Sequence, residues 1–383
     1  MKKKIAYMNS GFFDTDITVI KELQKYYQVD WFVVNNELRY SNEFFRNYVC
    51  GTDIKLHLYK YKRLRDFKLI YIYLKIALLI LKNNMEIIFT ATYEPYWCFW
   101  ATLLVKRNRL VMGVHDVLLH SDWKMPRLLK WGRGYLFFWL KHFVLYSQSQ
   151  KKEFENKYKK DCHLVYMSSK NFGVPTVERP PIENKVRLLF WGNIQRYKGV
   201  DLLIDSVEEL YHQGYKNFEV SIYGNFRTNL SIDEHYPELC KEKIKTISLY
   251  NLQFRYLLNE EIPDLLMSHH FFILPYRDAT QSGPMMAAIN YSLPIIAPDF
   301  GCFSEILEHG TNSILYNSKK EDGLTNSILR ALEMNSKEYG QLLKKCDELK
   351  TIFSEENIGM NYKKCFDKII YANSVHEGDV KMD

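Results

Sequence analysis

Short apolar runs alternate with amphipathic stretches along the first half of the chain. Residues 4–9 form an apolar run that ends at Ser10-Gly11, residues 15–27 carry apolar side chains at helical spacing, and residues 29–34 are apolar again. The pattern predicts a strand, a turn, a helix and a second strand. It continues with strands near 54–59, 86–90, 109–114 and 142–146 and with helices near 63–82, 95–105, 126–140 and 148–158. This order predicts a parallel sheet with helices on both faces.

A polar, proline-containing stretch around residues 173–181 interrupts the pattern, which then starts again. Further strands are predicted near 186–191, 218–223, 245–249, 270–274, 294–297 and 313–316, with a helix near 199–213 after the first of them. Residues 321–371 have helical patterns and no further strand. We therefore predict an α/β fold of two doubly wound Rossmann-like domains that face each other across a cleft, with ligands at the carboxyl ends of the strands.

The length supports two domains, because single cores stop growing at roughly 250 to 300 residues and the chain has 383. We place the N-terminal domain at residues 1–175 and the C-terminal domain at residues 184–352. Residues 353–375 are expected to form a helix that crosses back to the N-terminal domain.

Composition is that of a soluble globular protein, with 47% apolar and 25% charged residues. The seven cysteines are scattered and form no C-x-x-C pair, so they support neither a disulfide framework nor a zinc knuckle. The N-terminus lacks the apolar segment of a signal peptide. The longest apolar run, residues 69–81, is shorter than the roughly 20 residues that a membrane span needs. We expect a cytoplasmic protein.

Charge is distributed unevenly between the two halves. Residues 1–170 contain 29 Lys and Arg against 15 Asp and Glu, a net charge of +14, whereas the remainder carries −7. A basic half indicates an anionic partner, which can be a phosphate-bearing substrate, nucleic acid or the anionic leaflet of a membrane. No nucleic-acid-binding motif is present, so we do not expect nucleic acid as the partner.

Two strand-end loops of the second half could bind phosphate. The first, Gly192-Asn-Ile-Gln-Arg-Tyr-Lys-Gly199, combines two glycines with the cations Arg196 and Lys198; the alternative is a turn with two solvated basic side chains. The second loop leads into a helix for which Ser282 is a suitable N-cap and Pro284 a suitable first-turn residue. Its N–H groups would attract an anion, although an ordinary capped helix start would look the same.

The order of four segments in this half resembles the C-terminal domain of retaining GT-B glycosyltransferases, specifically glycosyltransferase family four. The segments are F-W-G-N-I-Q-R-Y-K-G-V-D-L-L-I at 190–204, S-I-Y-G at 221–224, L-P-Y-R-D-A-T-Q-S-G at 274–283 and S-L-P-I-I-A-P-D-F-G-C-F-S-E-I-L at 292–307. The resemblance covers about 150 residues well and the first half in outline. It implies transfer of a sugar, with retention, from a nucleotide diphosphate sugar.

The resemblance assigns roles to residues of both loops. Lys198 and Arg196 would neutralise the donor diphosphate, and Asn193 stands where the family usually has an arginine. The two glutamates that the family commonly uses, one facing the transferred sugar and one the ribose, are replaced by Ala279 and Ala287. The donor contacts expected in their place are Asp278, Thr280, Gln281, Ser282 and Gly283.

In the first half, the resemblance points to Gly11 and His115. Gly11 matches a loop that lets the diphosphate and the acceptor approach, and otherwise it is a tight turn. His115 follows the predicted strand 109–114 and matches a histidine near the reacting sugar; the alternative is a structural histidine. His115 and His120 are five residues apart and do not have the i, i+4 spacing of a helical zinc pair, so no metal is expected.

Two basic aromatic stretches, residues 60–65 and 126–141, could lie on a bilayer. The membrane-surface residues predicted in them are Arg127, Lys130, Trp131, Arg133 and Trp139. Because both stretches are also expected to cover a sheet, part of their apolar surface must belong to the core.

The sequence thus predicts a cytoplasmic glycosyltransferase at the inner face of the membrane, acting in surface polysaccharide biosynthesis. Its co-substrate would be a UDP- or GDP-sugar, its acceptor a lipid-linked saccharide or an oligosaccharide, and it would need no cofactor. The alternative, suggested by Ala279 and Ala287, is a catalytically impaired GT-B protein that binds a nucleotide sugar or a saccharide.

Overall fold

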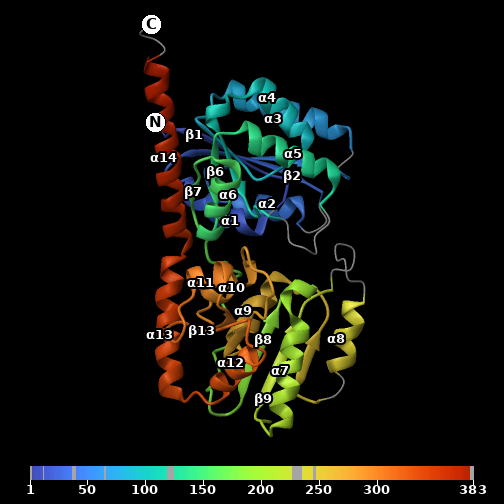
Figure 1. Cartoon of the computed structure of the whole chain (residues 1–383). Coiled ribbons are helices and arrows are strands. Elements are labelled where there is room, and N and C mark those ends of the chain that lie inside the picture. The colour runs from blue at the N-terminus through green and yellow to red at the C-terminus, as the bar shows by residue number, and fades with distance from the viewer. Residues whose placement is uncertain are drawn as a thin grey trace. The chain divides into compact units, whose positions relative to one another are not determined.

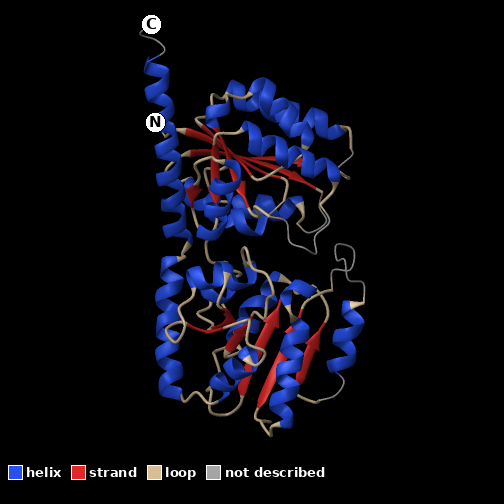
Figure 2. Cartoon of the chain, viewed as in Figure 1, coloured by secondary structure: helices blue, strands red, loops and turns tan. Residues whose placement is uncertain are grey.

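The computed structural model describes residues 2–11, 13–36, 40–63, 66–118, 125–226, 235–244 and 247–379 of the chain. It divides into two compact units. The N-terminal unit consists of Met1–Val117, Met125–Ser168 and Glu355–Asp383, and the C-terminal unit of Leu118–Lys124 and Ser169–Ser354. Each unit is a parallel sheet between helices (Figure 1), and Figure 2 shows the two sets of strands in red.

The sheet of the N-terminal unit has seven parallel strands in the order β3-β2-β1-β4-β5-β6-β7. Its strands are β1 (Lys4–Asn9), β2 (Gln28–Asn35), β3 (Lys55–Lys60), β4 (Ile87–Thr90), β5 (Leu110–Val114), β6 (His142–Leu145) and β7 (His163–Leu164). Its helices are α1 (Phe13–Leu23), α2 (Asn42–Val49), α3 (Lys68–Lys82), α4 (Pro95–Leu104), α5 (Arg127–Trp139), α6 (Gln148–Tyr158) and α14 (Glu355–Asp379). A short 3-10 helix, Arg107–Arg109, precedes β5.

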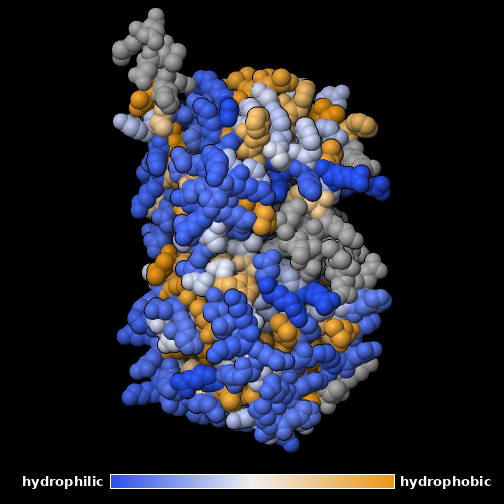
Figure 3. Space-filling view, in the orientation of Figure 1, coloured by the Kyte–Doolittle hydropathy of each residue, from blue (hydrophilic) through white to orange (hydrophobic). Residues whose placement is uncertain are grey.

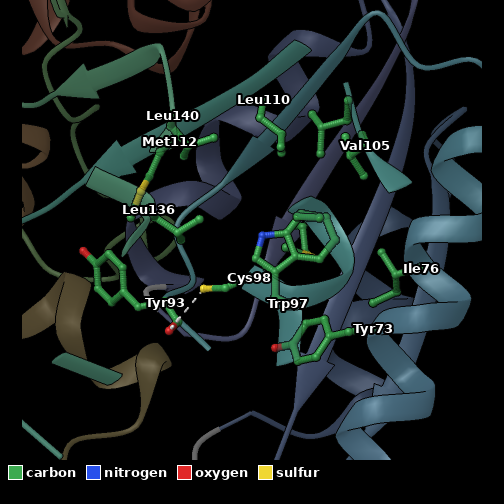
Figure 4. Packing of buried hydrophobic residues seen from close by; sticks show 14 of the residues in the cluster. Tyr73, Ile76, Tyr93, Trp97, Cys98, Val105, Leu110, Met112, Leu136 and Leu140 are labelled. Carbon is green, nitrogen blue, oxygen red and sulfur yellow. Dashed lines mark hydrogen bonds between the residues drawn. The ribbon is translucent and has the colours of Figure 1, made fainter. Parts of the chain in front are cut away.

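The central strands of this unit are buried along almost their whole length, as expected for a parallel sheet covered on both faces. The core lies between the sheet and helices α3, α4 and α5, where Tyr73, Trp97 and Leu136 point toward one another (Figure 4). The C-terminal helix α14 packs beside α1 in the same unit. There the Tyr27 hydroxyl donates a hydrogen bond of 2.8 Å to Asp367 Oδ1.

The sheet of the C-terminal unit has six parallel strands in the order β10-β9-β8-β11-β12-β13. Its strands are β8 (Val186–Trp191), β9 (Phe218–Tyr223), β10 (Tyr250–Gln253), β11 (Phe271–Ile273), β12 (Ile295–Pro298) and β13 (Ser313–Tyr316). Its helices are α7 (Val200–His212), α8 (Tyr236–Ile244), α9 (Ile262–Met267), α10 (Gly283–Asn290), α11 (Gly301–Ile306), α12 (Gly323–Leu332) and α13 (Ser336–Ile352), with 3-10 turns at Arg196–Lys198 and Asn259–Glu261.

The predicted α/β class with two doubly wound Rossmann-like sheets is confirmed, and most predicted elements lie within a few residues of the observed ones. The strand expected at 245–249 is wrong: β10 begins at Tyr250, and residues 245–246 lie outside the described part. The short elements α2, β7, α8, α9 and α11 were not predicted, because segments of two to nine residues show little periodicity. Among the described residues, no helix combines the length and apolarity needed to cross a bilayer.

Candidate functional site

The site of the C-terminal unit is built where the strand order reverses, between β8 and β11. Ligands of open α/β sheets bind at the carboxyl ends of the strands at such a point. Gly192 follows β8 with a φ of +145°, which side-chain-bearing residues rarely adopt. A Cβ atom on Gly192 would lie 3.4 Å from both Lys198 Nζ and Pro284 Cγ. The lysine and the start of α10 therefore meet beside this glycine.

Lys198 ends the 3-10 turn that leads from β8 into α7. Its side chain is buried, with 6% of the residue exposed, and Nζ lies 5.1 Å from the centroid of the Tyr276 ring. The next residue, Gly199, has a φ of +67°, and a Cβ atom there would lie 1.9 Å from the Pro275 carbonyl oxygen. The fold thus requires Gly199, because only glycine lets this turn approach the loop after β11.

Arg277 fixes the same turn from the loop after β11. Its backbone N–H donates to the Tyr197 carbonyl at 2.6 Å, and Nη1 donates to the Arg196 carbonyl at 2.8 Å. Its guanidinium also binds the Asp201 carboxylate in the first turn of α7. Burial alone would raise the pKa of Asp201, but hydrogen bonds from Arg277 and Tyr236 outweigh burial and lower the pKa below its usual value. The sequence reasoning did not identify Arg277, whose partner is 76 residues away.

Helix α10 begins at the site as predicted. The Ser282 hydroxyl accepts a hydrogen bond of 3.2 Å from the Met285 N–H, which identifies it as the N-cap. Pro284 has no N–H group, so Gly283 is the residue of this first turn that can present its N–H group to an anion. The positive end of the helix dipole lies at the same place.

Lys170 brings a further cation to this helix start. Its backbone N–H donates to the Met286 carbonyl at 3.0 Å, and Nζ lies 2.9 Å from the position that a Cβ atom on Gly283 would take. The side chain therefore reaches back by one turn of α10, toward the end where a cation is normally unfavourable. The sequence reasoning missed Lys170, because it precedes β8 by 16 residues and only the packing of its segment on α10 brings it here.

The other predicted donor contacts lie around these groups. Asn193, Thr280 and Gln281 are partly exposed, and Arg196 is exposed. Asp278 lines a hollow of about 600 Å³ together with Arg277 and Asp299. Ala279 and Ala287, which replace the family's glutamates, are buried, with 5% and 0% of their surface exposed.

In the N-terminal unit, the strand order reverses between β1 and β4. Gly11 follows β1, and apart from its chain neighbours no atom of the described residues lies within 4 Å of the position that a Cβ atom would take on it. The preceding Ser10 donates a hydrogen bond of 2.6 Å to Thr92, which follows β4. Glu94 is buried nearby, and its burial raises its pKa to about 7.

His115 follows β5 in the same unit and is 5% exposed. Its ring stacks on Tyr146 with centroids 4.7 Å apart. Arg133 of α5 holds the residues after His115, since Nη2 donates to the carbonyl oxygens of Asp116 and Val117. His120, which the metal argument used, lies outside the described residues.

The residues predicted at a membrane surface are not all at the surface. Arg127, Lys130 and Trp131 are exposed and Trp139 is partly buried. Arg133 is 9% exposed, and its guanidinium binds backbone carbonyls and lies over the Phe137 ring. The predicted surface role of Arg133 is therefore wrong, because its charge is used inside the unit. Of the other basic stretch, residues 64 and 65 lie outside the described part.

Within the part of the chain that the structure describes, no group of three or more His, Cys, Asp or Glu side chains is arranged to hold a metal ion. The groups assembled at the C-terminal site are instead two lysines and a helix N-terminus. Such groups bind an anion such as a phosphate.

Comparisons with known proteins agree with this architecture. Residues 185–334 match the family described as glycosyl transferases group 1. HepE from Anabaena, solved with UDP and glucose, is 13% identical, with a TM-score of 0.72 over 96% of this chain and 100% of that one. Sucrose-phosphate synthase from Thermosynechococcus elongatus is 12% identical, with a TM-score of 0.72 over 97% and 100%. The lipopolysaccharide outer core galactosyltransferase WaaB is 13% identical, with a TM-score of 0.67 over 95% and 99%.

At these identities the shared feature is the fold, which is GT-B, as expected from the sequence. A search of curated protein sequences gave no match. The matched residues 185–334 lie within the unit that carries Lys198 and the start of α10.

Proposed function

We propose that the protein is a glycosyltransferase that takes a sugar from a nucleotide diphosphate sugar, either a UDP-sugar or a GDP-sugar, and transfers it to a saccharide. The observation that carries this proposal is the buried ammonium group of Lys198 beside Gly192 and the first turn of α10. Lysine is rarely buried this deeply, and here it lies where open α/β sheets bind ligands. The family match over residues 185–334 supports the same reaction.

The reaction needs positive charge at this place. As the bond between the anomeric carbon and the diphosphate oxygen breaks, its electron pair leaves with the nucleoside diphosphate. The acceptor hydroxyl forms the new bond to the anomeric carbon and gives up its proton. Lys198, Lys170 and the N-terminus of α10 would stabilise the negative charge of the leaving group. Arg196 and Asn193, together with Thr280, Gln281 and Gly283, are proposed to complete the donor contacts.

The N-terminal unit is proposed to bind the acceptor and the transferred sugar. Gly11 would allow close approach at the end of β1, and His115 would hydrogen-bond the reacting sugar. We propose a lipid-linked saccharide or an oligosaccharide as the acceptor, in the synthesis of a surface polysaccharide at the inner face of the membrane. The net charge of +14 on residues 1–170 supports a location next to an anionic membrane surface. Retention of configuration is proposed from the resemblance to family four.

The experiment that tests the reaction is a screen of UDP- and GDP-sugars, in which mass spectrometry measures the released nucleoside diphosphate. The variant Lys198→Met keeps an apolar stem in the buried site and removes the charge. It should lower turnover by about a hundredfold, which is the effect of removing one preorganised charge-stabilising group. Lys350→Met, at an exposed position of α13, is the matched control and should leave turnover unchanged.

A second candidate function follows from Ala279 and Ala287, since both positions are buried and provide no carboxylate. In that case the chain would bind a nucleotide sugar without transferring it. Binding of a nucleotide sugar without release of UDP or GDP from any donor would favour this alternative. Absence of both binding and release would contradict both functions.

A further inference from the structure

Helices α3, α4 and α5 carry an unusual share of the exposed apolar residues. Nineteen large apolar side chains are exposed in the described part of the chain, and nine of them lie on these helices or directly before α3. The helices have only 15, 10 and 13 residues. Phe67, directly before α3, and Tyr71 on α3 are 76% and 74% exposed, and Phe138 on α5 is 79% exposed. Scattered single apolar residues are normal on a surface, but a concentration of this kind indicates an interaction site.

The three helices form one continuous surface on the N-terminal unit. Trp100 of α4 donates from Nε1 to the Ile70 carbonyl of α3 at 2.9 Å, and the hydroxyls of Thr102 and Tyr135 join α4 to α5 at 2.8 Å. In Figure 1 they lie together on the same side of the sheet, and Figure 3 shows hydrophobic side chains gathered over α3 and α4. We refer to the exposed side of α3, α4 and α5 as the outer face.

The outer face is not unfinished core. The opposite sides of the same helices are already packed, with Tyr73 of α3, Trp97 of α4 and Phe137 of α5 almost completely buried. Figure 4 shows Tyr73 and Trp97 pointing into that core. Exposed residues such as Phe99 and Leu103, at 57% and 60%, therefore have no role in the core of the unit.

The charges of the outer face have one sign. The sequences of α3, α4 and α5 contain no Asp or Glu. Along α3, Lys68, Lys75 and Lys82 recur every seven residues, and all three are exposed. Tyr71 and Leu78 have the same spacing, so a row of cations runs parallel to a row of apolar side chains on this helix. Such an arrangement is typical of a helix that lies in the plane of a membrane interface.

Aromatic side chains strengthen this pattern on α5. Trp131, Tyr135 and Trp139 follow one another at intervals of four residues, and their rings are stacked with centroids 5.6 and 6.3 Å apart. Tryptophan and tyrosine are enriched at the level of lipid headgroups. A second copy of this chain is the less suitable partner, because an isologous contact would set these lysines against each other.

We infer that the outer face docks on an anionic lipid bilayer, with α3, α4 and α5 lying along its surface. The inference rests on the proposed function in one respect, which is that a lipid-linked acceptor would be bound at the bilayer surface. It extends the surface beyond the stretches 60–65 and 126–141 expected from the sequence to α3 and α4, and it excludes Arg133.

Co-sedimentation of the full chain with vesicles tests the inference. Vesicles of phosphatidylcholine with phosphatidylglycerol should bind the protein, and binding should weaken in salt and with phosphatidylcholine alone. Lys68→Gln, Lys75→Gln and Lys82→Gln combined should lower the affinity about a hundredfold, as expected for three cations near an anionic surface. A second triple variant, with Phe99→Ser, Leu103→Ser and Phe138→Ser, should also lower the affinity for these vesicles at least tenfold. The control is Tyr256→Ser with Leu258→Ser, which are each 60% exposed on the C-terminal unit.

Equal binding of both outer-face variants and the wild type would overturn the inference. So would a dimer, seen by light scattering, that the apolar substitutions abolish, because the outer face would then cover a second copy. Release of UDP or GDP from donor sugars without vesicles should be unchanged in these variants. Vesicle binding without any donor turnover would contradict the proposed function and leave the docking surface standing.

Discussion

Arg277 binds Asp201 through both terminal nitrogens, with Nη1 2.8 Å from Oδ1 and Nη2 2.6 Å from Oδ2. The pair joins the loop after β11 to the first turn of α7. Since Arg277 also holds the carbonyls of Arg196 and Tyr197, the ion pair positions the turn that carries Lys198. It is a positioning device for the proposed donor site.

Removing the Arg277 side chain should therefore lower the stability of the protein. Arg277→Met leaves the mostly buried Asp201 carboxylate without its cation and should destabilise the protein by about 2 to 3 kcal/mol, less than for a fully buried pair because the arginine is partly exposed. Urea unfolding measures this loss. Asp201→Asn in the Arg277→Met background should recover part of it, and a pair that contributes nothing to folding would show neither effect.

Lys170 provides a separate test of the anion site. Lys170→Met should weaken binding of UDP or GDP about tenfold, because one charge-assisted contact to the diphosphate is lost. Affinity for the uncharged nucleoside should not change. Isothermal titration of wild type, Lys170→Met and the Lys350→Met control measures both affinities. A uniform loss for nucleoside and diphosphate would instead indicate that the segment holding Lys170 against α10 has been disturbed.

His115 can be tested without losing its packing. His115→Phe keeps an aromatic ring against Tyr146 and removes the hydrogen-bonding nitrogens. If the histidine contacts the reacting sugar, the transfer rate should fall about a hundredfold or more while diphosphate affinity and melting temperature stay close to wild type. A lower melting temperature with activity reduced only in proportion to folded protein would assign His115 a structural role.

Glu94 gives the stability of the protein a defined pH dependence. Burial raises its pKa to about 7 in the folded state, from 4.5 in the unfolded chain. The folded state therefore binds the proton of Glu94 more tightly than the unfolded chain does. This difference adds to the free energy of unfolding at low pH, and the added stability is lost as the pH rises through 7. Glu94→Gln should raise the free energy of unfolding, and by about 2 kcal/mol more at pH 8 than at pH 5.

Urea unfolding of wild type and Glu94→Gln at the two pH values measures this difference. The control Glu178→Gln changes an exposed carboxylate of the C-terminal unit and should show no such dependence. An equal effect of Glu94→Gln at both pH values would contradict a titrating Glu94.

Local sequence signals predicted the parts of the site that are local in the structure. The glycines of the first loop were expected to permit close backbone approach, and Gly192 and Gly199 do so at positive φ. Ser282 was expected to cap a helix, and its hydroxyl accepts the Met285 N–H. Such features depend on a few consecutive residues, and therefore a single sequence contains them.

The remaining parts depend on contacts between distant segments. The partner of Arg277 is in another element, and Lys170 reaches its place only because residues 169–172 pack along α10. The burial of Arg133 was not predicted for a different reason. Helix α5 has aromatic residues all around, so its sequence pattern does not reveal which side faces inward. In the structure, Gly132 packs against the Tyr93 carbonyl, 2.2 Å from where its Cβ atom would lie, and the neighbouring Arg133 is buried.

In the proposed function, the diphosphate of the donor binds beside Lys198 and the start of α10. Phosphorus-31 NMR of UDP and GDP titrated with the protein tests it most directly. With the wild type, both phosphorus resonances of at least one nucleotide should shift and broaden, and with Lys198→Met these changes should be largely lost while Lys350→Met retains them. Binding that leaves the phosphorus resonances unaffected, or that is the same in Lys198→Met as in the wild type, would contradict the claim.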